Sequence, residues 1–133
     1  MAAFGLPNGL TGVRPPAAPA AVAAAGDALG DVLHPRLLDF YAHTDGLYAD
    51  DGVTVYEAVS LAERNDTFEV GVYTPGYLLI GDDSGGRGIL LAVDIPESPV
   101  YVSDLGDLHP TGFEVASTSM AAWLDALAGG AAD

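Results

Sequence analysis

The hydrophobic pattern of this chain changes period twice, and that change constrains the fold more than any single motif does. Apolar residues recur every three or four positions up to about residue 45, alternate with polar residues between Val53 and Ser103, and return to helical spacing after Ser117. Helices followed by strands and then a helix are typical of an α+β domain, not of a repeating βαβ unit. We therefore predict a mainly antiparallel sheet of about four to six strands, packed with two N-terminal helices and one C-terminal helix.

Residues 1–19 are rich in alanine, glycine and proline and are predicted to form an arm, followed by one domain over residues 20–133. A chain of 133 residues is close to the usual size of a single domain. With no recognisable signal peptide, no membrane-spanning run and no cysteine, the expected location is the cytoplasm. Prolines interrupt any long helix, strand or signal-peptide core within the arm at four positions: Pro7, Pro15, Pro16 and Pro19.

Two helices are expected before the strands. The first begins at Pro19, and the second covers residues 35–45 with Gly46 as its C-terminal cap. We expect the two helices to pack together as a hairpin. Their apolar stripes are Val22, Ala25, Leu29, Val32 and Leu33 in the first helix, and Leu37, Leu38, Phe40 and Tyr41 in the second.

Strand patterns follow, with one short helix expected over residues 57–64. The glycine-rich connection over residues 81–87 is typical of a hairpin turn, so the strands on either side of it should be antiparallel neighbours. The predicted strands cover residues 53–55, 68–72, 77–80, 88–95 and 100–103.

The C-terminal helix has the clearest pattern. Ser117, Thr118 and Ser119 offer an N-cap, and Gly129 and Gly130 end the helix. Trp123 shares one helical face with three other apolar residues, so we predict that it is buried in the core. Its companions on that face are Met120, Leu124 and Leu127.

The formal net charge is −15, with 19 acidic residues against 4 basic ones, all of them arginine. This charge disfavours unaided binding to nucleic acid or to an anionic membrane and favours a basic partner. Acidity also keeps proteins in solution, which is the simpler explanation for any single carboxylate. Pairs of carboxylates nevertheless fall in predicted loops, where binding residues concentrate: Asp50 with Asp51, Asp82 with Asp83, and Asp104 with Asp107.

Every catalytic or metal-binding motif in the sequence is incomplete. The glycine spacing over residues 81–86 resembles a phosphate-binding loop, but Arg87 and Gly88 replace its lysine and hydroxyl residue. Asp82 and Asp83 are adjacent, whereas a calcium loop alternates its ligands and ends on a glutamate. Ser84 lacks the spacing of a nucleophile elbow, and the three histidines show no spacing for a shared metal. We expect no enzymatic activity, no metal and no cofactor.

The order of several short motifs resembles the SUKH superfamily, which includes fungal cell-wall assembly regulators and many bacterial immunity proteins. The family pattern runs from Leu-Pro, through a helix ending in Phe-Leu or Phe-Tyr and an Asn-Gly-Gly turn, to a Gly-Asp-Asp-Gly-Gly-Gly turn, a Pro-Val-Tyr strand and an Ala-Ser-Ser-Phe helix. This chain departs from it by an inserted His34, by Asp45 in place of Asn, by one lost glycine and by Met120 in place of the aromatic residue. The corresponding motifs here are Leu33-His34-Pro35, Phe40-Tyr41, Asp45-Gly46-Leu47, Gly81-Asp82-Asp83-Ser84-Gly85-Gly86, Pro99-Val100-Tyr101 and Ala116-Ser117-Thr118-Ser119-Met120.

The resemblance implies a non-enzymatic domain that neutralises a cognate polymorphic toxin, frequently a nuclease. The family also contains modules of larger assemblies, so a SUKH-type adaptor is the alternative, and an unrecognised enzyme is a third hypothesis. Independently of the family, clustered loop carboxylates are expected to capture a basic protein partner. The expected partner-binding residues are the loop carboxylates with the neighbouring tyrosine: Tyr48, Asp50, Asp51, Asp82, Asp83, Asp104 and Asp107.

Overall fold

The computed structural model describes residues 6–7, 9–30, 33–49 and 51–129. Within these residues it contains five α-helices, one short 3-10 helix and six strands. In chain order the elements are α1 Pro19–Leu29, α2 Pro35–Tyr41, β1 Leu47–Tyr48, β2 Thr54–Val55, α3 Ala58–Thr67, α4 Val70–Tyr73, β3 Tyr77–Asp82, β4 Arg87–Ala92, β5 Val100–Asp104, η1 Pro110–Gly112, β6 Glu114–Ser117 and α5 Met120–Gly129.

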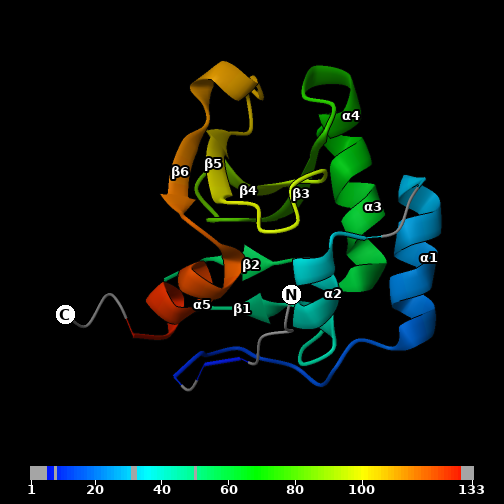
Figure 1. The fold of residues 1–133 in the computed structure, drawn as a ribbon, viewed down its shortest axis with the longest axis vertical. Helices are drawn as coiled ribbons and strands as arrows, with labels where there is room; N and C mark the ends of the chain where they lie inside the picture. The colour runs from blue at the N-terminus through cyan, green and yellow to red at the C-terminus, as the bar shows by residue number, and fades with distance from the viewer. Residues whose placement is uncertain (1–5, 8, 31–32, 50, 130–133) are drawn as a thin grey trace.

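The six strands form one sheet in the order β1-β2-β3-β4-β5-β6, and every neighbouring pair is antiparallel. This confirms the predicted α+β class and the predicted hairpin between β3 and β4. In Figure 1, α1 and α3 lie side by side at one flank of the sheet, and α5 follows β6. Each strand therefore pairs with its neighbour in sequence, even though α3 and α4 lie between β2 and β3.

The helix predicted over residues 35–45 is shorter than expected. It ends at Tyr41, after which the N–H groups of His43 and Thr44 both donate to the carbonyl of Phe40 and close a turn. Gly46, at φ +84°, then directs the chain into β1. The predicted α1–α2 hairpin is also wrong, because α1 lies along α3 and a groove separates it from α2.

The strand predicted over residues 68–72 is wrong. Phe68 caps α3, Glu69 adopts a left-handed conformation at φ 53°, and the next four residues form α4. Val70 is buried, but Val72 is 69% exposed, so the alternating residues do not share a buried face. Three alternating apolar residues fit a helical turn as well as a strand, and the long-range packing of Val70 decides between them.

Two edge strands were not predicted. Leu47–Tyr48 and Glu114–Ser117 are too short to show a full alternating pattern, and each is recruited by pairing with a longer neighbour. The expected strand over residues 88–95 ends early, because the chain turns after Ala92.

The prediction for Trp123 is confirmed, since this residue is only 7% exposed. The side chain of Ser119 accepts a hydrogen bond from the N–H of Ala122 at 3.1 Å, which confirms the predicted N-cap of α5. Asn65 is one of the buried polar side chains that have several hydrogen-bond partners. Asn65, on α3 and 7% exposed, exchanges hydrogen bonds of 2.9 Å with both the N–H and the carbonyl of Leu79.

The described part of the N-terminal segment covers the outer edge of β1. Val13 forms a bridge with Leu47, and the N–H of Tyr48 donates to the carbonyl of Gly12 at 3.3 Å. A Cβ atom at Gly12 would collide with the carbonyl oxygen of Tyr48, so only glycine permits this approach. At the opposite edge, β6 has no described strand beyond it, and Val115 is 59% exposed.

Candidate functional site

Three loops that carry the predicted carboxylates lie at the same end of the sheet. Because neighbouring strands are antiparallel, the β1–β2, β3–β4 and β5–β6 connections all leave from this end, where Thr54 pairs with Asp82 and Arg87 pairs with Asp104. We call this surface the acidic end. It comprises Asp51, Asp82, Asp83, Asp104 and Asp107; the predicted Asp50 lies outside the described residues.

Hydrogen bonds join the three loops to one another. The hydroxyl of Ser84, in the β3–β4 turn, donates to the carbonyl of Gly52 in the β1–β2 turn at 2.6 Å. The N–H of Leu105, after β5, donates to the carbonyl of Gly86 at 2.9 Å. The acidic end is therefore a connected surface and not three independent loops.

Most of these carboxylates also hold their own turns. The Oδ1 atoms of Asp51 and Asp104 accept from backbone N–H groups two residues further on, at 3.2 and 2.8 Å. Asp83 Oδ1 accepts from Gly85 at 2.7 Å and from Arg87 at 3.1 Å. The second oxygen of each of these three groups makes no hydrogen bond within the described residues, so it remains able to accept from a partner.

Asp82 is more fully engaged. Its Oδ1 accepts from the N–H of Ser84 at 2.9 Å, and its Oδ2 accepts from the hydroxyl of Tyr56 at 2.7 Å. Burial and the hydrogen bond to Asp82 raise the pKa of Tyr56, so this hydroxyl keeps its proton and donates. Asp82 is thus chiefly a residue that positions the turn.

Asp107 and Tyr48 are the freest of the predicted residues. Asp107 is exposed and its carboxylate makes no hydrogen bond within the described part of the chain, while Tyr48 is 62% exposed on β1. The structure therefore brings the described loop carboxylates to one end of the sheet but gives them different roles. Asp82 maintains the turn, and Asp107 is available for contact.

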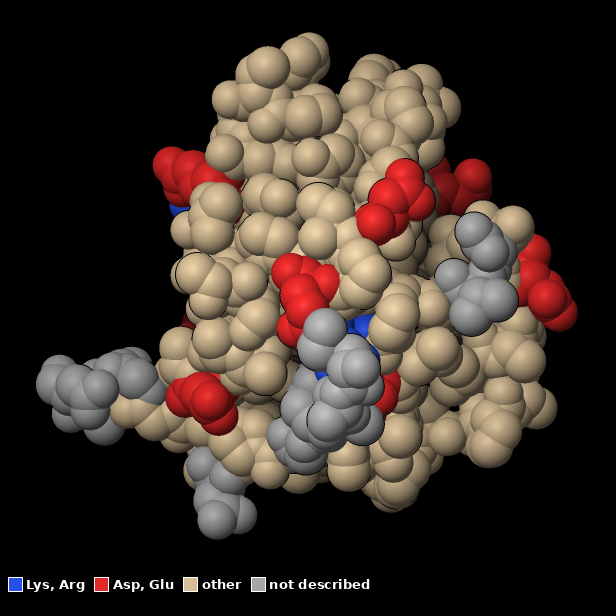
Figure 2. All heavy atoms as spheres, viewed as in Figure 1, with Lys and Arg blue, Asp and Glu red and all other residues tan. Residues whose placement is uncertain are grey.

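All four arginine side chains are engaged in ion pairs. Each of the four arginines forms an ion pair, at 2.6 to 3.0 Å, with a carboxylate that is not one of the five aspartates of the acidic end, and Arg87, which lies beside Asp104 at the acidic end, pairs with Glu114. Figure 2 shows one face of the molecule, with several separate acidic groups and very little basic surface. The four ion pairs are Arg14–Glu57, Arg36–Asp39, Arg64–Glu63 and Arg87–Glu114.

The β3–β4 turn should weaken in acid. The N–H groups of Gly85 and Arg87 hold the pKa of the Asp83 carboxyl below its usual range. A carboxyl whose pKa is lowered by folding contributes stability above its unfolded pKa, about 3.9, and loses that contribution as the pH falls through the folded value. A carboxyl-carbon NMR titration should give Asp83 a pKa below about 3.9. The idea fails if Asp83 titrates at or above that value.

Histidine serves a structural role that the sequence analysis did not identify. His34 is 3% exposed, and its Nδ1 accepts from the N–H of Arg36 at 3.0 Å as the N-cap of α2. Its Nε2 lies 2.7 Å from the carbonyl oxygen of Ile95 and therefore donates to it. A side-chain acceptor just before Pro35 at the helix start is the signal that points to this cap.

The described residues contain no cluster of three or more histidine, aspartate or glutamate side chains arranged to hold a metal ion. Every helix among them is too short or too polar to cross a membrane.

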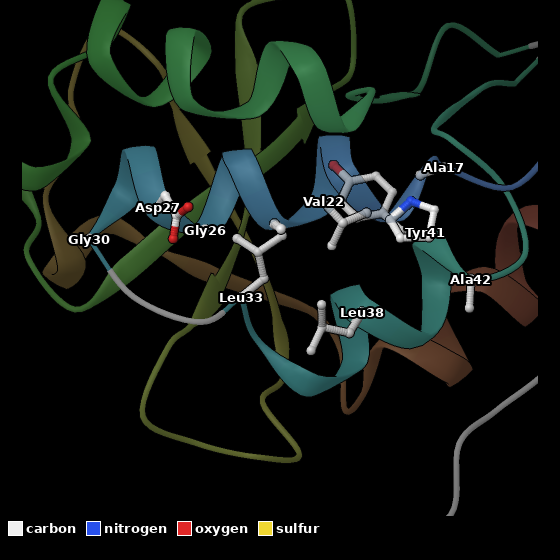
Figure 3. A pocket seen from close by; sticks show the side chains of 11 residues that line it. Ala17, Val22, Gly26, Asp27, Gly30, Leu33, Leu38, Tyr41 and Ala42 are labelled. Atoms are coloured by element: carbon white, nitrogen blue, oxygen red, sulfur yellow. The ribbon is translucent and has the colours of Figure 1, made fainter.

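A feature that the sequence analysis missed is the groove between α1 and α2, which encloses about 800 Å³ and is lined mainly by apolar side chains (Figure 3). It forms between helices that the periodicity predicted to touch.

Comparison with known proteins adds no assignment, since neither a protein-family model nor any curated protein sequence matches this chain.

Proposed function

We propose that this chain is a non-enzymatic, cytoplasmic protein-binding domain of the SUKH type, and that it acts as an immunity protein against a basic, nuclease-type toxin. The observation that carries the proposal is the convergence of three carboxylate-bearing loops at the acidic end, where the nearby cation of Arg87 is already paired with Glu114. The order of helices, antiparallel strands and C-terminal helix agrees with the resemblance.

The acidic end suits such a partner for a chemical reason. A nuclease must present lysine and arginine side chains to the phosphates of its substrate. The free oxygens of Asp51, Asp83 and Asp104, with the carboxylate of Asp107, can accept hydrogen bonds from those same cations. Binding there would cover or neutralise the nucleic-acid surface of the toxin.

Association should be steered by charge. Complementary fields raise association rates by about 10- to 1,000-fold at low ionic strength, and salt screens the effect. Replacing Asp83, Asp104 and Asp107 together with asparagine should therefore slow association about tenfold at low salt. Asparagine keeps an Oδ1 acceptor for the turn bonds of Asp83 and Asp104, so the loops should persist.

The matched control replaces three exposed carboxylates outside the acidic end, Asp66, Asp94 and Asp125, with asparagine. Both variants lose the same number of charges, so a general effect of net charge slows them equally. The partner is first captured from the native host and identified, and its association with purified protein is then measured at low and high salt. Equal rates for the two variants would remove the acidic end as the docking surface. Capture of subunits of a larger assembly in place of a toxin would replace the immunity role with the adaptor role.

A further inference from the structure

The groove between α1 and α2 is a well-formed concave feature of the described structure. Val22 from α1, Leu38 from α2 and Leu33 before α2 face one another across it (Figure 3). Its volume of about 800 Å³ lies within the range of sites that hold organic ligands or groups of side chains. The remaining lining residues are mostly small, among them Ala23, Gly26 and Ala42.

The floor of the groove is apolar. Leu33 and Tyr41 are buried, and the hydroxyl of Tyr41 donates to the carbonyl of Tyr56 at 2.8 Å, in the domain interior. Tyr41 therefore presents its ring to the groove and has its polar atom satisfied elsewhere. Val22 and Leu38 on the walls are only half-buried, so apolar surface remains exposed to water.

Among the described residues that line the groove, one side chain is charged. Asp27, on α1, is exposed, and its carboxylate forms no hydrogen bond or ion pair within the described residues. The chain has no lysine, and its four arginines are paired with other carboxylates. An apolar groove beside an unpaired carboxylate is therefore suited to a binding partner that combines apolar side chains with a positive charge.

We propose that this groove receives an amphipathic basic helix of a protein partner, with apolar side chains inserted between α1 and α2 and a lysine or arginine placed on Asp27. A helix that presents apolar residues at i, i+3, i+4 and i+7 fits a groove of this kind. The inference extends the proposed function by giving the basic partner a second, apolar contact. The acidic end then governs association, and burial in the groove governs dissociation.

The test uses three fluorescently labelled peptides and the purified full chain. The first peptide has leucines at helical spacing with lysines at the remaining positions. The second has the same composition with the leucines scrambled, and the third has glutamate in place of each lysine. We expect the first peptide to bind about tenfold more tightly than the second and the third to bind least.

Variants locate the binding. Ala42→Trp places an indole at the exposed rim of the groove and should abolish the advantage of the first peptide, whereas Ala126→Trp, on the exposed face of α5, should preserve it. Asp27→Asn should weaken the first peptide several-fold more than Asp125→Asn does. Circular dichroism melts verify that each variant is folded.

Three results would overturn the inference. Equal affinity for the first two peptides would mean only general attraction to an acidic protein. Unchanged binding by Ala42→Trp would place the peptide elsewhere. Self-association lost in Ala42→Trp, measured by sedimentation, would make a second copy of this chain the occupant. No toxin enters these measurements, so they can succeed or fail independently of the immunity role.

Discussion

Replacing Asn65 with leucine should lower the free energy of unfolding by about 3 kcal/mol. The reason is that the Asn65 carboxamide continues the sheet where β2 stops. The N–H of Tyr56, just after β2, donates to the carbonyl of Ile80, and the next groups along β3 are those of Leu79. These bond to Asn65, whose Nδ2 also donates to the carbonyl of Leu61 at 2.9 Å.

Leucine fills a similar volume but leaves both the N–H and the carbonyl of Leu79 without these partners in the core. Each unsatisfied buried group costs about 1 to 3 kcal/mol, and partial relaxation reduces the sum. Urea unfolding should show a lower midpoint, and hydrogen exchange at the Leu79 amide should accelerate. Asp66→Leu, at the next and exposed position of α3, is the matched control and should change stability little. Equal stability of Asn65→Leu and Asp66→Leu would show that the carboxamide is dispensable.

Replacing Trp123 with alanine should cost about 3 to 5 kcal/mol, because a buried indole leaves a cavity that the surroundings fill only in part. Trp123 is part of the core together with Met120 and Leu124, both fully buried on the same helix. The loss is a large share of the roughly 5 to 15 kcal/mol that stabilises a typical domain.

Thermal and urea unfolding should therefore both shift strongly in Trp123→Ala. Ala126→Ser, at an exposed position of the same helix, controls for a change of sequence in α5 without loss of core volume. If Trp123→Ala melted at the wild-type temperature, α5 would contribute little to the core.

The fold class could be predicted because it rests on signals carried by long stretches. The helical spacing of Met120, Trp123 and Leu124 and the apolar runs of β3 and β4 each persist long enough to identify their period. Shorter segments depend on their neighbours. Residues 68–72 alternate like a strand but form helix, and β6 is a strand because Tyr101 and Val102 offer it a partner.

The candidate site was predictable in composition but not in geometry. The carboxylate pairs are visible in the sequence, and their convergence follows from a meander in which alternate connections share one end. The different roles of these carboxylates were not visible in the sequence, because they depend on which carboxylate oxygen accepts from which donor. Both oxygens of Asp82 accept hydrogen bonds, whereas only one oxygen of Asp83 does. The groove was not predicted because the apolar stripes of the first two helices were expected to pack against each other, whereas in the structure a groove separates α1 from α2.

The unequal edges of the sheet limit how copies of this protein can associate. The N-terminal segment occupies the edge at β1, and within the described residues the outer edge of β6 is left open. Strand-to-strand joining of native molecules would therefore bring β6 against β6 of a second copy, related by a twofold axis. Such a pair is closed, because each remaining outer edge is already covered. Continuous fibres need two free edges in every molecule, so growth beyond a dimer requires first detaching the segment around Gly12 and Val13.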